Sequence, residues 1–282
     1  MPELPEVEVT RLGLLPHLPG WKITAFFYSG KRLRLPFSTK LLKKCICGST
    51  VAALDRRAKY LLIRMDNGSV LVIHLGMTGK LGLFAKTAAR ATHDHLCLEL
   101  TSGLELRFND VRRFGSVIVW PSDEAERLEE EFNNSQGLEP FSPDFTAVNL
   151  AELAQDRRQP IKTFFMDGRQ ISGIGNIYAN ETLFAAKIHP KTPAGSLNLA
   201  EWQRIADCAV AILKRAIAAG GSTVSDFLGS SGKPGHFQLQ LAVYGKENKP
   251  CPVCGEKICK EQLGGRATFF CSSCQFLLQR SD

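Results

Sequence analysis

The stretch KYLLIRMDNGSVLVIHL, residues 59–75, decides how the first half of this chain folds. Two apolar runs, residues 59–65 and 69–75, flank an Asp-Asn-Gly triplet at 66–68. Asn-Gly between such runs is a strong hairpin signal, because both residues tolerate the positive φ that a tight turn requires. The stretch therefore predicts two antiparallel strands joined by a short turn.

A second hairpin is predicted around Ser102 and Gly103. Along its two arms every second residue is apolar: Leu96, Leu98, Leu100, Leu104, Leu106 and Phe108. Alternation of this kind predicts strands with one buried face. Strand signals recur from about residue 20 to about residue 121, so the first half of the chain is interpreted as β-rich.

The second half of the chain changes to a helical period. The acidic residues 122–132 predict a surface helix, and the turn-rich residues 137–143 predict a linker. Asn198 with Glu201 three residues later has the form of a capping box, and the glycines at 220 and 221 predict the end of the helix that it opens. The predicted buried face of this helix carries Ile205, Ala209, Ile212 and Ala216. Residues 229–236, rich in glycine and serine, predict a mobile loop.

Four cysteines in the last part of the chain form the sharpest local signal. Cys251 and Cys254 make one Cys-x-x-Cys pair, and Cys271 and Cys274 make a second. Two such pairs at this distance suit a tetrahedral Zn²⁺ held by four thiolates; the alternatives are a chance cluster and a redox pair. A closed four-thiolate site has no open coordination position, so the ion would be structural. Cys259 lies between the pairs without a partner at this spacing and is left out of the ligand set.

Composition bounds the partner and the cellular setting. A length of 282 residues favours two domains. The chain has 35 lysines and arginines against 28 acidic residues, a formal net charge of +7 that favours an anionic partner. No apolar run approaches the ~18 residues of a membrane span, and no secretory signal is visible. The scattered cysteines outside the quartet favour a reducing cytoplasm.

The first residues, MPELPE, hold the candidate for covalent chemistry. Because proline is small, we expect removal of Met1, which makes Pro2 the N-terminus. An α-amino group titrates at about 7.7–8.0, so a useful fraction is neutral and nucleophilic at neutral pH. A secondary amine gives a charged iminium directly, an electron sink like a lysine Schiff base, and Glu3 could exchange the accompanying proton. On these residues alone, the alternative remains that the prolines only keep the first turn extended.

Short motifs recur along the whole chain: PELPEVE at 2–8, RRAKY at 56–60, HLGMTG at 74–79, RRFG at 112–115, GIGNIY at 173–178 and the cysteine quartet. In these motifs and in their order, essentially end to end, the chain resembles the formamidopyrimidine-DNA glycosylases, bifunctional enzymes that excise oxidised purines. One departure is Val111, where the family often has proline. That departure leaves the neighbouring functional side chains in place.

The resemblance implies an α+β fold. It consists of an N-terminal β-sandwich catalytic domain with flanking helices (2–130), a linker (131–148), a helical helix–two-turn–helix DNA-binding domain with a lesion-capping loop (149–236), and a zinc finger built on a zinc-bound β-hairpin (237–275). The implied partner is double-stranded DNA containing oxidised bases or abasic sites, and no membrane. We expect a monomer with one structural Zn²⁺ as its cofactor, in the bacterial cytoplasm and associated with the nucleoid.

By resemblance, four residues carry the chemistry. Pro2 attacks the sugar C1′ of a flipped nucleotide as the base leaves, and Glu3 supplies a proton. The iminium acidifies the C2′ proton, so β-elimination cuts the 3′ side and δ-elimination the 5′ side. Lys59 contacts phosphate and the damaged nucleotide and assists elimination. Arg266, at a predicted hairpin tip after two glycines, grips phosphates and takes part in the second elimination. Without the resemblance, Lys59 and Arg266 would be interpreted as ordinary exposed cations.

The resemblance also implies how the duplex is held and opened. Asn176 binds a backbone phosphate after a glycine turn, at a helix N-terminus, where N–H groups and the dipole favour anions. The further DNA contacts implied are His74, His93, Arg112, Arg113 and Tyr244. Three side chains, called here the wedge residues, enter the duplex: Met77, Arg112 and Phe114. They fill the space that the flipped nucleotide vacates, which offsets the cost of unstacking. Without that context, Met77 and Phe114 would be interpreted as core fillers.

Two other functions stay open on the sequence. The endonuclease VIII branch of the same superfamily prefers oxidised pyrimidines. Against it stand the Leu-Pro pair after Glu3, where that branch typically has Gly-Pro, the complete set of wedge residues and the long loop at 221–238. A non-catalytic zinc DNA-binding homologue would keep the fold without the activity. Against it stands the joint presence of Pro2, Glu3 and Lys59.

Overall fold

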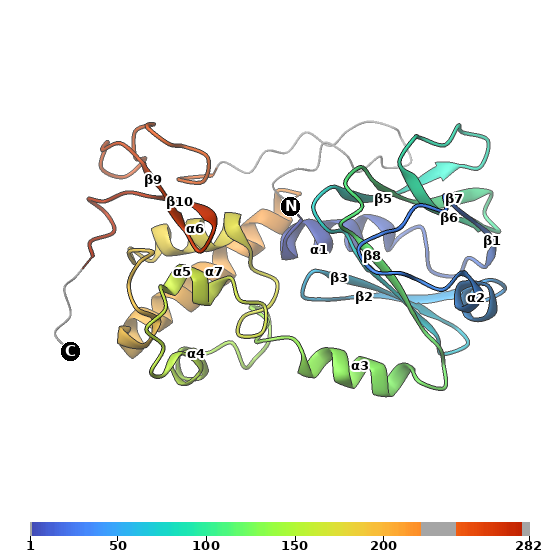
Figure 1. Cartoon of the computed structure of the whole chain (residues 1–282), viewed down its shortest axis with the longest axis horizontal. Coiled ribbons are helices and arrows are strands. Elements are labelled where there is room, and N and C mark those ends of the chain that lie inside the picture. The colour runs from blue at the N-terminus through green and yellow to red at the C-terminus, as the bar shows by residue number, and fades with distance from the viewer. Residues whose placement is uncertain (1, 221–240, 278–282) are drawn as a thin grey trace. The chain divides into compact units, whose positions relative to one another are not determined.

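The structure is a computed structural model, and it describes residues 2–220 and 241–277 (Figure 1). The described residues form two compact units. Unit 1 holds the residues up to 134 together with 219 and 220, and unit 2 holds the rest. The predicted mobile loop and lesion-capping loop, within 221–238, lie outside the described residues.

Unit 1 contains two four-stranded sheets. The first has the order β1-β6-β7-β5, with β1 Ile23–Tyr28, β6 Asp94–Leu100, β7 Leu104–Asp110 and β5 Gly79–Ala85. The second has the order β2-β3-β4-β8, with β2 Val51–Arg57, β3 Tyr60–Met65, β4 Val70–His74 and β8 Ser116–Trp120. Leucine, isoleucine and valine side chains from both sheets meet in one buried core. The β-sandwich expected for this half is confirmed.

Both predicted hairpins are present. β3 pairs antiparallel with β4, with Ile63 opposite Leu71, and Gly68 in their turn has a φ of 84°. Glycine adopts this left-handed conformation at little steric cost because it has no Cβ, which explains its place in the turn. β6 pairs antiparallel with β7, with Leu98 opposite Leu106.

The prediction of a single buried face for β6 and β7 is wrong, because polar residues are buried on the other face. Arg107 and Glu105 are 2% and 1% exposed. The Arg107 guanidinium donates to Glu105 at 2.8 Å and to the carbonyls of Ala88 and Ala89 at 2.6 and 2.9 Å. The segment 86–92 is thereby tied to this face. A buried charge has to be paired, and long-range pairing of this kind leaves no period-two signal in the sequence.

Helices complete unit 1. α1, Leu4–Leu14, packs against β2, β3 and β5. α3, Ala125–Asn134, covers the outer face of the second sheet, where it joins a buried cluster with Val72 and Trp120, and so confirms the predicted acidic surface helix.

A short helical segment interrupts the region predicted to be strands throughout. α2, Thr39–Leu41, continues into the π-turn η1, Leu42–Ile46. Ser38 caps its start, because the Ser38 hydroxyl accepts a hydrogen bond from the Leu41 N–H at 3.2 Å. Leu42, Cys45 and Ile46 then face the core, a helical spacing that competes with the strand pattern around it.

Unit 2 is helical, with a hairpin in its last part. Its elements are α4 Ala147–Ala154, α5 Ile161–Phe165, α6 Asn176–Ala185, η2 Ala194–Ser196, α7 Leu199–Ala218, β9 Cys259–Leu263 and β10 Arg266–Phe270. The predicted capping box opens α7: Asn198 N–H donates to Glu201, and Glu201 N–H donates to the Asn198 side chain, both at 2.9 Å. Among the described residues, no helix is long and apolar enough to cross a bilayer.

Candidate active site and nucleic-acid interface

Pro2 and Glu3 lie at the start of α1, whose inner side is part of the core of unit 1. Glu3 is the N-cap residue and is only 1% exposed. Its N–H donates to the Glu6 carboxylate at 2.8 Å, half of a capping box. Val7, one turn further on, is fully buried and fixes the helix against the sheets. The capping hydrogen bond and the buried Val7 therefore hold Glu3 and the neighbouring Pro2 at a fixed place on unit 1.

Lys59 lies in a two-residue turn between β2 and β3, because Arg57 pairs with Tyr60. The prediction that it opens a strand is therefore wrong by one residue. Ala58, the other turn residue, is buried with a φ of 53°, in the left-handed region that non-glycine residues seldom adopt. The turn thus presents Lys59 at a sharp, constrained corner of the second sheet.

An ion pair connects this corner to α1. Arg56 donates to the Glu8 carboxylate of α1 at 2.9 Å and to the Ala58 carbonyl at 3.0 Å. Burial acts to raise the pKa of Glu8, but hydrogen bonds and charges from Arg11 and Arg56 lower it overall. The carboxylate is therefore held ionised, and the helix that carries Pro2 is tied to the turn that carries Lys59.

His74 ends β4 directly opposite Tyr60, with which it stacks at a ring distance of 4.7 Å. Burial lowers its pKa to about 4, and the charges of Arg34 and Lys59 contribute to the shift. The Nδ1 atom accepts the Gly76 N–H at 3.1 Å, so the proton of the neutral ring is on Nε2. His74 can therefore offer a neutral N–H donor, beside two cations, to an anionic group.

The wedge residues come from two loops of unit 1. Met77 lies between β4 and β5, and Arg112 and Phe114 lie between β7 and β8. The Arg112 guanidinium lies 4.5 Å from the centre of the Phe114 ring, and Phe114 is 44% exposed. A large aromatic side chain left in solvent in this way is not a core filler, which removes the alternative interpretation for Phe114.

Thr78 and Asp110 lock these two loops together. The Thr78 hydroxyl donates to the Asp110 carboxylate at 2.5 Å and accepts the Arg112 N–H at 3.0 Å. The other carboxylate oxygen of Asp110 accepts the Gly115 N–H at 2.8 Å. Gly76 packs so closely that an added Cβ would lie 2.4 Å from the Gly115 nitrogen. Neither loop can move far without the other.

His95, which the sequence reasoning did not select, supports the same lock. It is 3% exposed, and its Nε2 donates to the Asp110 carbonyl at 3.0 Å while Nδ1 contacts the Ser29 hydroxyl at 2.9 Å. His93, two residues earlier, accepts the Asp110 N–H on its carbonyl at 3.0 Å. The available signal was a second histidine two residues after His93, at the start of β6. Arg113, another predicted contact, is exposed beside Asp110 with a φ of 57°.

In unit 2, Asn176 is the first residue of α6 and Arg266 the first of β10. The Asn176 amide donates to the Ala267 carbonyl at 3.0 Å. The same carbonyl accepts a hydrogen bond at 3.1 Å from the ammonium group of Lys162, a fully buried residue of α5. The shared carbonyl places Asn176 next to the exposed Arg266. Lys162 was not selected from the sequence, where a lysine in a helical segment is normally a solvated residue.

The hairpin tip and Tyr244 are also fixed within unit 2. Gly264 and Gly265 have φ values of 56° and 71°, which confirms the predicted tight tip before Arg266. The Tyr244 ring packs edge-to-face against Phe269 of β10, with ring centres 5.2 Å apart. Its N–H donates to Glu181 of α6 at 2.8 Å, and the same carboxylate accepts the N–H groups of residues 242 and 243.

The four predicted cysteine ligands converge. All four sulfurs lie within 4.8 Å of one another, with 3.4 Å between Cys254 and Cys271 and 3.9 Å between Cys251 and Cys274. A tetrahedron with Zn–S bonds of about 2.3 Å has edges of about 3.8 Å, so this donor set suits Zn²⁺. Cys259 stands outside the cluster, as predicted.

Comparison with known proteins identifies the family. Residues 1–117 match the formamidopyrimidine-DNA glycosylase N-terminal domain, 136–228 its H2TH domain, and 248–275 the zinc finger found in FPG and IleRS. A formamidopyrimidine-DNA glycosylase of Geotalea uraniireducens is 46% identical over 98% of this chain and 100% of its own length. The chain belongs to the formamidopyrimidine-DNA glycosylase family. A member from Vibrio cholerae is 45% identical with the same coverage of both chains.

Solved structures of this glycosylase family have the same fold. A Lactococcus lactis mutant bound to Fapy-dG DNA is 33% identical, with a TM-score of 0.88 over 98% of this chain and 100% of that one. The Lactococcus lactis protein bound to abasic-site DNA is 32% identical, with a TM-score of 0.87 and the same coverage. The α+β fold expected from the sequence is thus confirmed, and the zinc-finger match together with the four converging sulfurs confirms one structural Zn²⁺.

Proposed function

We propose that this DNA glycosylase of base-excision repair removes oxidised purines through a covalent intermediate on Pro2, and then cleaves the abasic strand. The observation that carries the proposal is the start of α1. There Pro2 precedes a buried Glu3 at the positive end of a helix that an ion pair ties to the Lys59 turn. A nucleophile, a carboxyl group and a cation are thus held by one rigid part of unit 1.

The proposed reaction displaces the base, opens the sugar and then eliminates the two phosphates in turn. The Pro2 nitrogen forms a bond to C1′, and the bond from C1′ to the base breaks with its electron pair going to the base, which takes up a proton. Glu3 provides the proton transfer that opens the sugar and leaves an iminium between Pro2 and C1′. Water takes up the C2′ proton, the C–H electron pair moves into the iminium to form an enamine, and the enamine expels the 3′ phosphate. A second elimination, assisted by Lys59 and Arg266, expels the 5′ phosphate, and water then hydrolyses the remaining iminium to release Pro2 from the sugar remnant.

The DNA contacts divide by their physical role. His74, His93, Arg113, Asn176 and Tyr244 are proposed to bind the backbone, which sets affinity for any duplex. The wedge residues are proposed to act only when a nucleotide leaves the stack. In support, Phe114 and Arg112 are exposed and stacked on each other, in a loop that Thr78 and Asp110 keep rigid. We also propose that the protein acts as a monomer, in the bacterial cytoplasm and in association with the nucleoid, where chromosomal DNA lies.

Borohydride trapping tests the proposal. Intact protein is mixed with duplexes that contain 8-oxoguanine or an oxidised thymine, reduced, and the crosslinked residue is mapped by mass spectrometry. We expect the crosslink on Pro2 in protein that lacks Met1, and more trapping on the purine lesion. Pro2→Gly should keep lesion binding and lose most trapping, although glycine still offers a primary amine.

The matched control is Pro5→Ala, which changes a second proline of the same helix start without touching the amine. It should trap like the unaltered protein. Undiminished trapping in Pro2→Gly with the crosslink on Lys59 would overturn the assignment. Preferred trapping on the oxidised thymine would favour the pyrimidine-specific alternative. That outcome is worth testing because a Lactococcus lactis relative has a solved structure with oxidised-pyrimidine DNA.

A further inference from the structure

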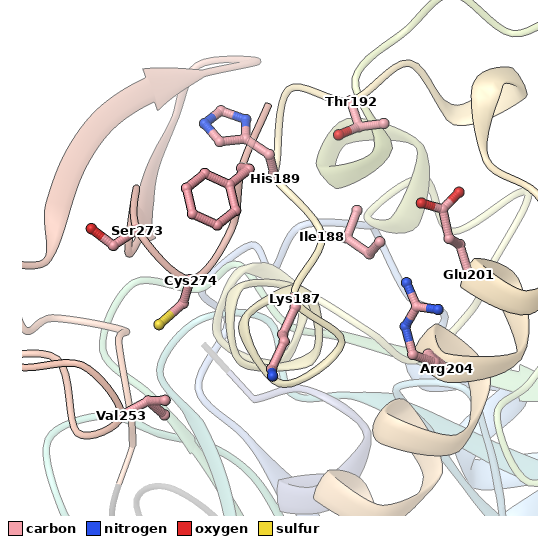
Figure 2. A pocket seen from close by; sticks show the side chains of 10 residues that line it. Lys187, Ile188, His189, Thr192, Glu201, Arg204, Val253, Ser273 and Cys274 are labelled. Atoms are coloured by element: carbon pink, nitrogen blue, oxygen red, sulfur yellow. The ribbon is translucent and has the colours of Figure 1, made fainter. Parts of the chain in front are cut away.

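A pocket with a volume of about 390 Å³ opens in unit 2, between the segment that joins α6 to α7 and the two Cys-x-x-Cys pairs (Figure 2). Its volume lies in the range of ~300–1,000 Å³ that is typical of ligand sites. Ile188 and Thr192 form buried parts of its lining. On the side of the Cys-x-x-Cys pairs, the pocket is lined by Val253 and Phe276, which are 67% and 68% exposed. This wall is therefore apolar and open to solvent.

Two cations line the pocket and are not neutralised there. Lys187 follows α6, Arg204 belongs to α7, and both are exposed. Within the described part of the chain, neither forms an ion pair with a carboxylate; Arg204 makes only a 3.5 Å hydrogen bond to the Ala186 carbonyl. The one acidic lining residue, Glu201, is 7% exposed and caps the start of α7, so its carboxylate is already engaged.

Thr192 adds a hydroxyl group to the lining. Exposed cations and an apolar wall in one hollow match a carboxylate joined to a bulky apolar group.

The pocket is separate from the proposed phosphate grip on the same helix. Asn176 is the first residue of α6, whereas Lys187 follows its last residue, and a helix of 10 residues is about 15 Å long. A phosphate backbone would leave the exposed Val253 and Phe276 uncovered, because it offers no apolar group to them. An apolar amino-acid side chain beside acidic ones would cover both parts of the pocket.

We propose that this pocket binds an acidic peptide segment of a partner protein, with an apolar side chain against Val253 and Phe276 and a carboxylate on Arg204 and Lys187. The site would let the enzyme be recruited without occupying its proposed contacts to DNA. This inference concerns unit 2 alone and does not rest on the proposed roles of Pro2 or the wedge residues.

Fluorescence anisotropy of the full-length protein tests the proposal. The probe is a fluorescein-labelled peptide Glu-Asp-Asp-Leu-Phe with a free C-terminal carboxylate. One comparison peptide has an amidated C-terminus, which separates the terminal carboxylate from the side-chain ones. A second, Gln-Asn-Asn-Leu-Phe, lacks the acidic side chains. Affinity for an undamaged duplex is measured in parallel as a readout of the intact DNA surface.

The variants isolate the two halves of the pocket. Arg204→Ala should weaken peptide binding about tenfold, the effect of losing one charged hydrogen bond, and Phe276→Ser should weaken it several-fold. Arg215→Ala is the matched control: it removes the same charge from the same helix 11 residues further on, outside the pocket. It should bind the peptide like the unaltered protein. All three variants should bind the duplex normally.

Four results would overturn the proposal. These are no saturable peptide binding at millimolar concentration, equal losses in Arg204→Ala and Arg215→Ala, equal binding of the peptide without acidic side chains, and displacement of the peptide by the undamaged duplex. The last result would assign the pocket to nucleic acid.

Discussion

Replacing Thr78 by valine tests whether the two wedge loops act as one body. Valine keeps the shape of threonine but removes the hydroxyl that donates to Asp110 at 2.5 Å and accepts from the Arg112 N–H at 3.0 Å. Asp110 is fully buried, so one of its carboxylate oxygens would lose a donor without gaining water. The exposed Arg112 N–H can turn to solvent instead.

The magnitude follows from these two bonds. A hydrogen bond to a charged acceptor contributes about 1.5–3 kcal/mol, and the solvated Arg112 N–H contributes little. We therefore expect Thr78→Val to lower the free energy of unfolding by about 2 kcal/mol. If half of that loss of free energy also raises the barrier to inserting the wedge residues into the duplex, excision slows by about fivefold. Thr78→Ser, which keeps the hydroxyl, should be close to the unaltered protein in both respects.

Two measurements separate the contributions. Urea unfolding gives the stability difference, and single-turnover excision of 8-oxoguanine gives the functional one at a temperature where both variants are folded. Affinity for undamaged duplex should stay unchanged, because backbone contacts set it. A valine variant that excises at the normal rate, or that loses undamaged-duplex affinity in proportion to its excision rate, would refute the coupling of the loops.

Three further outcomes are expected. Replacing Met77 and Phe114 together by alanine should sharply lower excision from a duplex and leave the salt dependence of undamaged binding intact; equal losses in both would assign these residues to the core. Cys271→Ser should lower the zinc content measured by elemental analysis and weaken duplex binding, since structural zinc contributes to folding, whereas Cys259→Ser should keep both. His74, with its pKa lowered to about 4 from an ordinary 6.5, stays neutral in the folded protein while the unfolded chain takes up a proton. Its stabilisation, up to about 3 kcal/mol, should be full above pH 6.5 and lost as the pH falls toward 4, and His74→Gln should flatten that part of a pH series of urea titrations.

Signals that lie within a few residues of one another were read correctly from the sequence. The Asp-Asn-Gly turn, the Asn198–Glu201 capping box and the tip at Gly264 each depend on local backbone preferences. The cysteine quartet was also found, because two short spacings carry most of its information.

Features that depend on distant partners were missed. Asp110 could not be recognised as the centre of the wedge lock, because its partner Thr78 is 32 residues away and neither residue is unusual alone. Arg107, in a strand, looked solvent-facing until the segment that covers it was seen. The strand predicted to begin at Lys59 begins one residue later, because Ala58, a non-glycine residue, adopts the positive φ of a turn. The proposed roles of the site residues likewise came from the resemblance.

The Ala267 carbonyl accepts hydrogen bonds from both Asn176 and Lys162, which lie outside the zinc finger. The finger is therefore a poor candidate for exchange between relatives. A graft cut just before the first cysteine pair would carry this carbonyl into the recipient and leave Asn176 and Lys162 behind in the source protein. Chimaeras should therefore succeed only when α5 and the start of α6 travel with the finger. In evolutionary terms, the start of α6 and the β9–β10 hairpin, the two proposed phosphate-binding elements of unit 2, are expected to change together rather than separately.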